Sequence, residues 1–345
     1  MKFRAAVLAK SREPLIVDEI HFPGPLAPGQ VLVRIEFSGI CGAQVNEIDA
    51  AKGPDRFLPH LLGHEGVGEV VEVGPLVSSV RPGDTVVLHW MVGEGVQSDP
   101  GAFEWRGKRL NAGWVTTLGE YTVASENRVT KVSSSLDGRY LPLFGCAATT
   151  AWGSLVNDVG LRLGESAVIL GVGGVGLLTV EAARAGGAHP IVAVDRHEER
   201  LEIAQSLGAQ TTLMSDQPEL EALIRQSVGE RSCDVIVETT GAREMIELAY
   251  RLAADGGRAV LVGVPRHDEP VSLDSLALHF GMTFTGSKGG SVSPEIDIPR
   301  LIDLAEAGLY RVTSLPITEL PLEEVNFGIE AIRTGQPGRI LINMK

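Results

Sequence analysis

The stretch that most constrains this chain runs from Ala167 to Asp195: an apolar run, a glycine-rich turn, helix-spaced apolar residues and a second apolar run. This order predicts a strand, a turn, a helix and a second strand. Within the turn, Gly171, Gly173 and Gly176 have the G-x-G-x-x-G spacing. The first permits a tight turn, the second lets backbone approach a pyrophosphate, and the third lets the helix pack on the strand. A glycine-rich loop can also only turn a chain, but this context favours a dinucleotide at the helix N-terminus.

Polar residues after the apolar runs extend this prediction. Asp195 ends the second run, where a carboxylate accepts hydrogen bonds from an adenosine ribose and repels a 2′-phosphate, so we predict NAD rather than NADP. Arg196 either meets a 2′-phosphate or is solvated. Gly241 and Gly263 follow later apolar runs and are expected to let the cofactor pass close to backbone, with ordinary turns as the alternative. The predicted cofactor contacts also include Gly174, Val175 and Arg200.

Two patterns of apolar runs divide the chain. Residues 3–132 contain short β runs between Gly- and Pro-rich turns, for example 31–37, 66–73 and 85–88, which predicts a mostly-β, barrel-like unit. Between about 148 and 286, strands alternate with helices, the rhythm of a doubly wound, parallel Rossmann sheet. Those strands are predicted at 167–170, 191–194, 212–214, 234–238, 259–263 and 283–286. Helices at 299–307 and 322–334 and an apolar run at 339–342 complete the chain.

The charge and length exclude several classes of partner. A chain of 345 residues with 44% hydrophobic residues can bury two cores, and a formal charge of −14 repels nucleic acid and anionic membranes. Residues 1–20 do not read as a secretory signal, and the most apolar stretch, 167–183, is glycine-dense and already explained as strand plus helix. We therefore expect a cytoplasmic enzyme with a small-molecule substrate and neither nucleic acid nor membrane as partner.

The three cysteines are too few, and odd in number, for a disulfide framework. Cys41 lies in SGICGAQ, Cys146 in LFGCAATTAWG, and His64 in LLGHEGVGEV. Two thiolates and one imidazole form the ligand set of a catalytic zinc that keeps its fourth position open. The alternative for each residue alone is a small side chain packed in the core.

The ordered series GICG, GHEGVGEV, GD-T-V, GCAATTAWG and GVGGVG resembles the zinc-dependent alcohol dehydrogenases of the medium-chain dehydrogenase/reductase family. The likeness runs from Arg4 to the C-terminus and is similar to classes I and III in particular. It implies that Cys41, His64 and Cys146 hold one catalytic zinc, and that Glu65 is a carboxylate able to approach that metal. The implied domains are a GroES-like catalytic β-barrel (1–148), an NAD-binding Rossmann domain (149–286) and a C-terminal return to the catalytic domain (287–345).

The same resemblance assigns further roles. Arg339 matches a basic residue near the cofactor pyrophosphate, with a surface charge on the closing strand as the alternative. Thr150 matches a hydroxyl in the nicotinamide pocket, with a cap on a helix starting near Ala151 as the alternative. The family also implies a homodimer or homotetramer, with the strand at 283–286 as the dimer edge.

Three positions depart from the family. Residues 89–114 contain no cysteine, which excludes the family's second, structural zinc site and predicts one zinc per chain. Ala43 and Asn46 stand where a hydroxyl and an imidazole usually relay the alcohol proton, and neither can accept and pass a proton. Water, Glu47, His89 or a substrate hydroxyl must replace them, although a lone histidine such as His89 is commonly packed or exposed. Gln44 replaces an aspartate that orients the zinc-bound histidine.

These observations lead to three hypotheses. The first is a zinc- and NAD-dependent oxidoreductase of a secondary alcohol or ketone, such as a polyol, sugar or cyclitol derivative. The second keeps the fold but makes the chemistry a conjugate (1,4) reduction or a redox-neutral step, because the proton relay is missing. The third is a catalytically dead NAD-binding protein with a structural or regulatory role.

Overall fold

The computed structural model describes residues 1–229, 233–253, 256–267 and 269–345 and divides into two compact units. The first unit comprises Met1–Cys146, Ser293–Glu306 and Ile317–Lys345, and the second comprises Ala147–Val292 and Ala307–Pro316. Among the described residues, no helix is long and apolar enough to cross a membrane.

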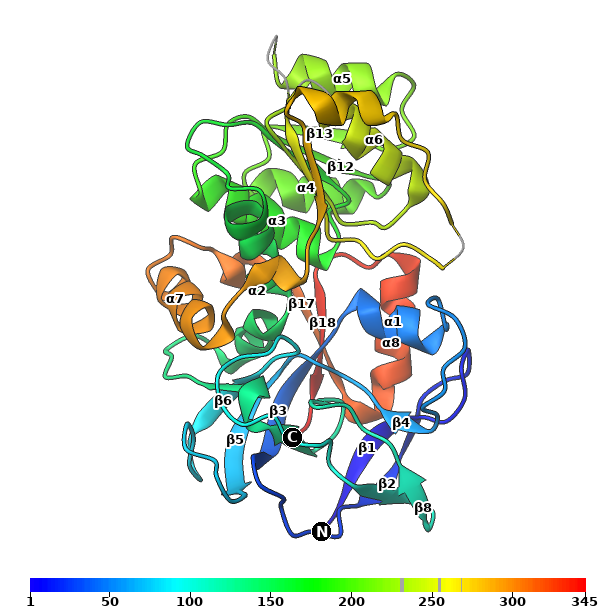
Figure 1. The fold of residues 1–345 in the computed structure, drawn as a ribbon, viewed down its shortest axis with the longest axis vertical. Coiled ribbons are helices and arrows are strands. Elements are labelled where there is room, and N and C mark those ends of the chain that lie inside the picture. Colours follow the sequence, from blue (N-terminus) through cyan, green and yellow to red (C-terminus); the bar gives the residue numbers. More distant parts are fainter. Residues whose placement is uncertain (230–232, 254–255, 268) are drawn as a thin grey trace. The chain divides into compact units, whose positions relative to one another are not determined.

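The second unit is built on a parallel sheet (Figure 1), which has six strands in the described part of the chain, in the order β13-β12-β11-β14-β15-β16. This confirms the predicted doubly wound sheet, whose strand order reverses between β11 and β14; ligands bind at such switch points, outside the carboxyl ends of the strands. The strands are β11 (Ala167–Leu170), β12 (Ile191–Asp195), β13 (Thr211–Met214), β14 (Val235–Glu238), β15 (Arg258–Leu261) and β16 (Thr283–Gly286).

Helices cover this sheet because its central strands are apolar apart from the carboxylates Asp195 and Glu238 at the ends of β12 and β14. Every residue of β11, β12 and β14 is buried, as expected for a sheet covered on both faces. Val168, Val192 and Ile236 pack in one cluster with Ile224 and Leu248 of two helices. The helical segments are α2 (Ala147–Gly153), η3 (Ser154–Asp158), α3 (Gly174–Ala185), α4 (Glu198–Leu207), α5 (Leu220–Ser227), α6 (Arg243–Ala253), η4 (Ser275–Phe280), η5 (Gly289–Ser291) and η6 (Val312–Ser314).

The first unit contains two sheets, which confirms the predicted mostly-β architecture. One has the order β10-β6-β5-β3-β18-β17 with β9 also paired to β3, and the other the order β4-β1-β2-β7-β8. The strands of the larger sheet are β3 (Gln30–Ile40), β5 (Gly66–Val73), β6 (Thr85–Leu88), β9 (Tyr121–Ser125), β10 (Val129–Lys131), β17 (Ile317–Pro321) and β18 (Arg339–Asn343). Those of the smaller sheet are β1 (Lys2–Leu8), β2 (Ile16–His21), β4 (His60–Leu61), β7 (Phe103–Trp105) and β8 (Lys108–Leu110).

A helix interrupts this β unit at a place where the sequence reading predicted none. α1 (Gly42–Ile48) begins directly after Cys41, whose backbone N–H donates to Gln44 Oε1 at 2.8 Å. This arrangement is a capping box in which cysteine takes the place of the usual Ser or Thr. The other helical segments of the unit are η1 (Glu126–Arg128), η2 (Gly138–Gly145), α7 (Pro294–Glu306), η7 (Leu322–Glu324) and α8 (Val325–Thr334).

A buried carboxylate anchors the two loops that flank β6. Glu126 is 1% exposed, and it accepts hydrogen bonds from the backbone N–H groups of Ser78 at 2.8 Å and Ser79 at 2.9 Å, before β6, and of Val96 at 2.8 Å, after β6. Although burial opposes ionisation, these bonds hold the pKa of Glu126 below its ordinary value. One carboxylate therefore ties the loop that follows β6 to the loop that precedes it.

The substitution Glu126→Gln tests this anchor. We expect it to lower the free energy of unfolding by about 1–3 kcal/mol, because an amide nitrogen would face the Val96 N–H and leave that buried donor unpaired. Denaturant unfolding measures the change, with Glu72→Gln on the exposed side of β5 as control. Equal stability of the two variants would contradict the assignment.

Candidate metal centre

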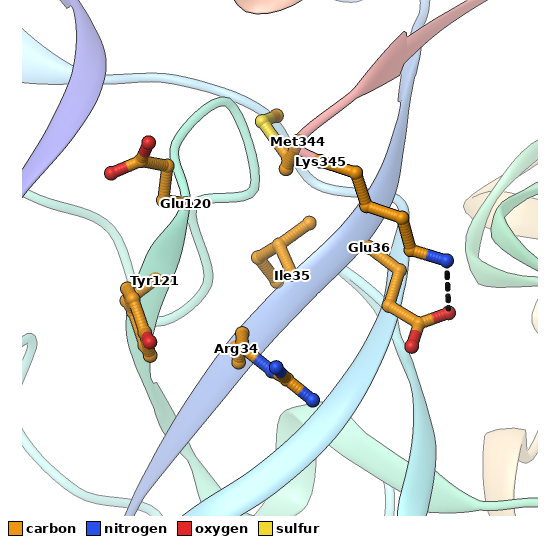
Figure 2. A pocket seen from close by; sticks show the side chains of 7 residues that line it. All are labelled: Arg34, Ile35, Glu36, Glu120, Tyr121, Met344 and Lys345. Atoms are coloured by element: carbon orange, nitrogen blue, oxygen red, sulfur yellow. Dashed lines mark ion pairs between the residues drawn. The ribbon is translucent and has the colours of Figure 1, made fainter.

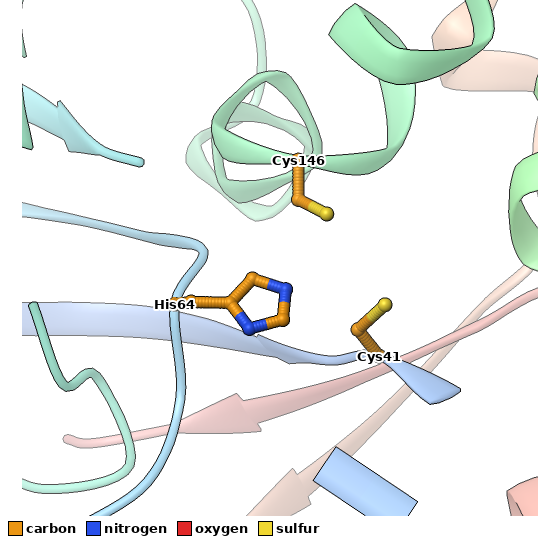
Figure 3. A group of neighbouring side chains, drawn as sticks. All are labelled: Cys41, His64 and Cys146. Atoms are coloured by element: carbon orange, nitrogen blue, oxygen red, sulfur yellow. The ribbon is translucent and has the colours of Figure 1, made fainter. Parts of the chain in front are cut away.

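Three side chains from distant parts of the first unit converge on one point (Figure 3). One ligand atom each of Cys41, His64 and Cys146 lies within 4.8 Å of the other two, and the two sulfurs face the edge of the imidazole ring. Cys41 follows β3, His64 lies between β4 and β5, and Cys146 follows η2. No second cluster of this kind occurs among the described residues.

The donors at this point fit a zinc ion. His64 Nε2 is buried and has no hydrogen-bond partner within the chain, an arrangement that costs free energy unless something binds the nitrogen. Two cysteine sulfurs and one imidazole nitrogen are the three protein ligands of a catalytic zinc site with an open fourth position. Cys41, His64 and Cys146 are therefore the residues that could hold the metal.

The pKa values of the Cys41 and Cys146 thiols are shifted in opposite directions. The hydrogen bond from Cys146 lowers the pKa of Cys41 well below its ordinary value, with His64 and Arg339 acting in the same direction against the effect of burial. The same hydrogen bond, together with burial, raises the pKa of Cys146. Since the thiolate is the form that binds metal, Cys41 is prepared as a ligand, and binding a metal would release the proton from Cys146.

Glycines make the approach of these segments possible. Gly63, next to His64, has φ +94°, and a Cβ there would lie 2.8 Å from the backbone nitrogens of Thr117 and Leu118. A Cβ on Gly145 would lie 2.2 Å from Leu88 O. The glycines that flank the ligands in the sequence therefore serve close packing around them.

Gln44 supports both Cys41 and His64. Its Oε1 accepts the Cys41 N–H, and its Nε2 lies 2.5 Å from His64 Nδ1. In this orientation the amide donates to Nδ1, and the ring proton lies on Nε2. If a metal bound Nε2, the ring hydrogen would lie on Nδ1, which would then need an acceptor. The side chain of Gln44 has a single oxygen. That one oxygen would have to accept hydrogen bonds from both the Cys41 N–H and the Nδ1–H of metal-bound His64.

Glu65 and Arg339 form a buried ion pair beside the ligands. Arg339 Nη2 donates to Glu65 Oε1, and the two residues are 4% and 0% exposed. Although burial opposes the charge, Glu65 and the two cysteines raise the pKa of Arg339. Glu65 lies outside the three-residue cluster, so its predicted approach to the metal stays a prediction. The surface-charge alternative for Arg339 is wrong, because the side chain is buried; its contact with a pyrophosphate is untested.

The proton-relay candidate His89 and the relay position Asn46 have different surroundings. His89 is 1% exposed, its Nδ1 bonds Met91 O at 2.8 Å, and its Nε2 bonds Thr130 Oγ1 at 3.0 Å. Burial lowers the pKa of His89 to about 4, so the ring is neutral at pH 7 and both nitrogens are engaged. This environment favours the packed alternative that the sequence left open. Asn46 is partly exposed on α1.

The glycine-rich turn of the second unit has the predicted local geometry. Gly171 has φ +88°, and a Cβ on Gly176 would lie 2.0 Å from Gly171 O, so the first glycine turns the chain and the third lets α3 approach β11. The nearest atom to a Cβ on Gly173 is Arg200 Nη1, at 3.9 Å. Gly174 and Val175 begin α3. A pyrophosphate on these residues stays a prediction.

Asp195 braces this turn. Its Oδ2 accepts the N–H of Val172 at 2.8 Å, its Oδ1 accepts the N–H of Arg196 at 2.8 Å, and Arg200 Nη1 lies 3.5 Å from Oδ2. The Arg196 side chain is exposed and bonds His197 Nε2 at 3.1 Å. The carboxylate thus lies beside the glycine-rich turn, and its contact with a ribose is untested.

The remaining predicted cofactor residues also lie in the second unit. A Cβ on Gly263 would lie 2.1 Å from Gly241 N, so packing of the two loops accounts for both glycines without a cofactor. Thr150 is buried inside α2, which starts at Ala147. The alternative that Thr150 caps a helix starting near Ala151 is therefore wrong.

A buried histidine that the sequence analysis did not consider lies on β4. His60 is 6% exposed, and its Nε2 lies 2.7 Å from Asp55 Oδ2 and 3.9 Å from Glu47 Oε1. The spacing of Asp55 and His60 in PDRFLPH is a weak signal. Only the fold brings Glu47 to the same histidine.

A surface hollow of about 350 Å³ lies elsewhere in the first unit, between β3, β9 and the C-terminus (Figure 2). Its charged groups are paired: Arg34 with Glu69, Glu36 with Lys345, and Glu120 with Arg4. This pairing gives the hollow little capacity to recognise a charged ligand.

Comparisons with known proteins agree with this geometry. Residues 27–134 match the family model for the alcohol dehydrogenase GroES-like domain, and residues 174–307 match that for zinc-binding dehydrogenases. The chain is 32% identical to putative alcohol dehydrogenase D of Mycobacterium tuberculosis, with 97% of this chain and 98% of the relative covered. It is 28% identical to S-(hydroxymethyl)glutathione dehydrogenase of Synechocystis, with 99% and 100% covered. Benzyl alcohol dehydrogenase of Acinetobacter calcoaceticus superposes with a TM-score of 0.91 at 25% identity, with 100% of both chains covered.

The substitution Gln44→Glu tests the role of this side chain at the metal centre. A carboxylate offers one oxygen to the Cys41 N–H and another to the His64 Nδ1–H, so we expect zinc to bind on the order of tenfold more tightly. Competition with a chromophoric chelator measures the affinity. Gln217→Glu, which adds the same charge at an exposed position of the second unit, serves as the control. An unchanged zinc affinity in Gln44→Glu would show that Gln44 does not limit the site.

Proposed function

This chain belongs to the zinc-dependent medium-chain alcohol dehydrogenases, and on that premise we propose that it transfers a hydride between NAD(H) and an alcohol or its carbonyl product. The observation that carries the proposal is the convergence of Cys41, His64 and Cys146 within 4.8 Å, with a buried and unpaired imidazole nitrogen among them. A structural or regulatory protein has no need of such a donor set.

Each part of the chain has a defined task in this reaction. A zinc ion held by the three ligands would polarise the substrate oxygen and lower the pKa of an alcohol, and NAD would accept the hydride. Gln44 orients His64, and the Glu65–Arg339 pair adds no net charge next to the ligands. The glycine-rich turn is suited to a pyrophosphate because, among the described residues other than its chain neighbours, the atom nearest to the Cβ position of Gly173 is the cationic Arg200 Nη1, at 3.9 Å.

The cofactor we propose is NAD. Asp195 ends β12 next to the glycine-rich turn, and a carboxylate at that place accepts hydrogen bonds from ribose hydroxyls and repels a 2′-phosphate. Arg200, at 3.5 Å from Asp195, offsets part of this repulsion. The preference for NAD thus rests on the Asp195 carboxylate, and use of NADP is the alternative.

For the substrate, we propose a secondary alcohol or its ketone, such as a polyol, sugar or cyclitol derivative. The support is the replacement of the usual proton relay by Ala43 and Asn46, which suggests a specialised substrate whose own hydroxyl groups add polar contacts. We also propose a cytoplasmic location, because Cys41 and Cys146 must both stay reduced to bind a metal, and the cytosol keeps thiols reduced.

Metal analysis combined with a screen of NADH formation tests the function. We expect about one zinc per chain, turnover with NAD in preference to NADP, and higher rates with polyols and sugars than with ethanol. Cys41→Ser should lose its zinc and at least a hundredfold in activity, because the site keeps only two of its ligands. Cys233→Ala, which removes a buried thiol of the second unit, should retain both.

Three outcomes would contradict the proposal. Zinc and turnover retained in Cys41→Ser would end the metal assignment. NADH consumption with enones, without oxidation of any alcohol, would select the conjugate reductase. NAD binding without turnover over the whole panel would select the regulatory protein.

We further propose that the enzyme is a homodimer joined through β16. This strand is the last one in its sheet, and an outer strand can pair with the same strand of a second copy about a two-fold axis. The preceding segment, η4, exposes Leu276 (59%), Leu278 (47%) and Phe280 (73%). These apolar side chains next to an unpaired strand edge fit a partner with the same surface.

Light scattering of two charged variants tests the dimer. Leu276→Glu combined with Phe280→Glu should shift the protein to monomers, because carboxylates would be buried at the interface. Leu163→Glu, at an 87% exposed residue of the same unit, should leave the mass unchanged. A wild-type monomer, or a dimer that survives the double substitution, would place the interface elsewhere or remove it.

A further inference from the structure

Alcohol oxidation releases a proton that some group must accept, and the inference below rests on the proposed function. One hydrogen and both electrons of the C–H bond leave as hydride to NAD, while the O–H proton leaves separately. Neither Ala43 nor Asn46 on α1 can accept it. The group that does so must lie near the metal ligands and reach solvent.

Glu47 on α1 is the candidate for this group, because it follows a metal ligand by six residues, feels the charge of His64 and reaches solvent. It lies near the C-terminal end of the helix that starts directly after Cys41, and its side chain is 46% exposed. Its Oε1 lies 3.9 Å from the Nε2 of the buried His60. Glu47 therefore lies on the helix that follows a metal ligand, is in contact with solvent, and is close to a buried histidine.

Two hydrogen-bond contacts fix the ring of His60. Nδ1 lies 2.9 Å from Leu61 O, and Nε2 lies 2.7 Å from Asp55 Oδ2. Although burial opposes it, the Phe57 N–H and His60 lower the pKa of Asp55, which favours the charged form of this carboxylate. The result is a buried histidine whose orientation is fixed by Asp55 and whose Nε2 faces Glu47 at 3.9 Å.

Charged groups around Glu47, among them the metal-ligand candidate His64, influence its pKa. Desolvation raises the pKa of Glu47, and Asp55 acts in the same direction, while His60, His64 and Lys52 oppose the rise. On α8, which packs against α1, Arg333 is paired with Asp49 and Glu330. A carboxylate whose pKa is raised binds a proton more readily than an ordinary glutamate, which suits a group that accepts and releases protons.

We propose that Glu47 accepts the proton of the alcohol through intervening water, and that His60, fixed by Asp55, is the positioning residue that holds Glu47 in place. The O–H bond of the alcohol breaks, and its proton passes to a Glu47 oxygen and from there to bulk water. The electron pair of the C–H bond leaves with the hydride for NAD, and the substrate becomes the carbonyl compound. In the opposite direction, Glu47 returns the proton to the reduced product.

Steady-state kinetics of the zinc-loaded enzyme test the role of Glu47. Glu47→Gln should lower kcat for alcohol oxidation by about 10- to 100-fold at neutral pH, leave KM and zinc content nearly unchanged, and abolish the acidic limb of the pH profile. Glu47→Asp should recover part of the rate. Glu72→Gln on β5 is the matched control and should behave as the wild type.

His60→Gln separates the positioning role from a merely structural one. Because His60 lowers the pKa of Glu47, its removal should raise that pKa and shift the acidic limb of kcat to higher pH, since oxidation needs the ionised carboxylate. A uniform loss of activity without a shift of this limb would contradict the positioning role.

NMR of metal-free protein gives a readout independent of turnover. In the wild type, the ring signals of His60 should show the titration of Glu47, because the two side chains lie 3.9 Å apart. That inflection should vanish in Glu47→Gln. Ring signals that do not respond to Glu47 would overturn the arrangement.

The two proposals fail in different ways. Wild-type protein without zinc or without alcohol turnover would refute the proposed function. Active wild-type protein whose Glu47→Gln variant keeps its rate and pH profile would refute the proton acceptor alone.

Discussion

The close approach of two sulfurs and one imidazole nitrogen is the constraint on which the first unit depends. β3 and β5 pair so that Ser38 lies opposite Gly66, and Gly39 N–H bonds Glu65 O at 3.0 Å, which brings the segment of His64 alongside the end of β3 at Cys41. The close approach of Gly145 to Leu88 O then holds Cys146 beside them. Strand pairing thus positions Cys41 and His64, and close packing of Gly145 positions Cys146, so the fold brings the three ligands together before any metal binds.

Charge compensation explains the residues around this point. Two thiolates balance a divalent ion, and Glu65 balances Arg339, so the buried group stays near neutrality once a metal is bound. Gln44 is the exception, because its single oxygen must serve both Cys41 and the metal-bound form of His64. A neutral side chain at this position makes the ring of His64 a weaker donor to the metal than a carboxylate would.

The sequence predicted elements whose signals are local and missed those that arise from tertiary contacts. The strands at 66–73, 85–88 and 283–286 have the predicted bounds, because Gly and Pro mark their ends. α1 was missed because its cap is a cysteine within a glycine-rich segment. α7 starts at Pro294, five residues before the predicted 299, because proline is favoured in a first helical turn. The metal ligands were predictable from residue types and motifs. The pairing of Arg339 with Glu65 was not, because these residues lie far apart in sequence. The contact between His60 and Glu47 was not, because no motif marks it.

Zinc K-edge X-ray absorption of the loaded protein tests the central claim most directly. If Cys41, Cys146 and His64 hold the zinc, we expect two sulfur neighbours at about 2.3 Å and nitrogen or oxygen neighbours at about 2.0–2.1 Å around each zinc. A spectrum with only oxygen and nitrogen neighbours, or protein that retains no zinc after exhaustive dialysis, would contradict it.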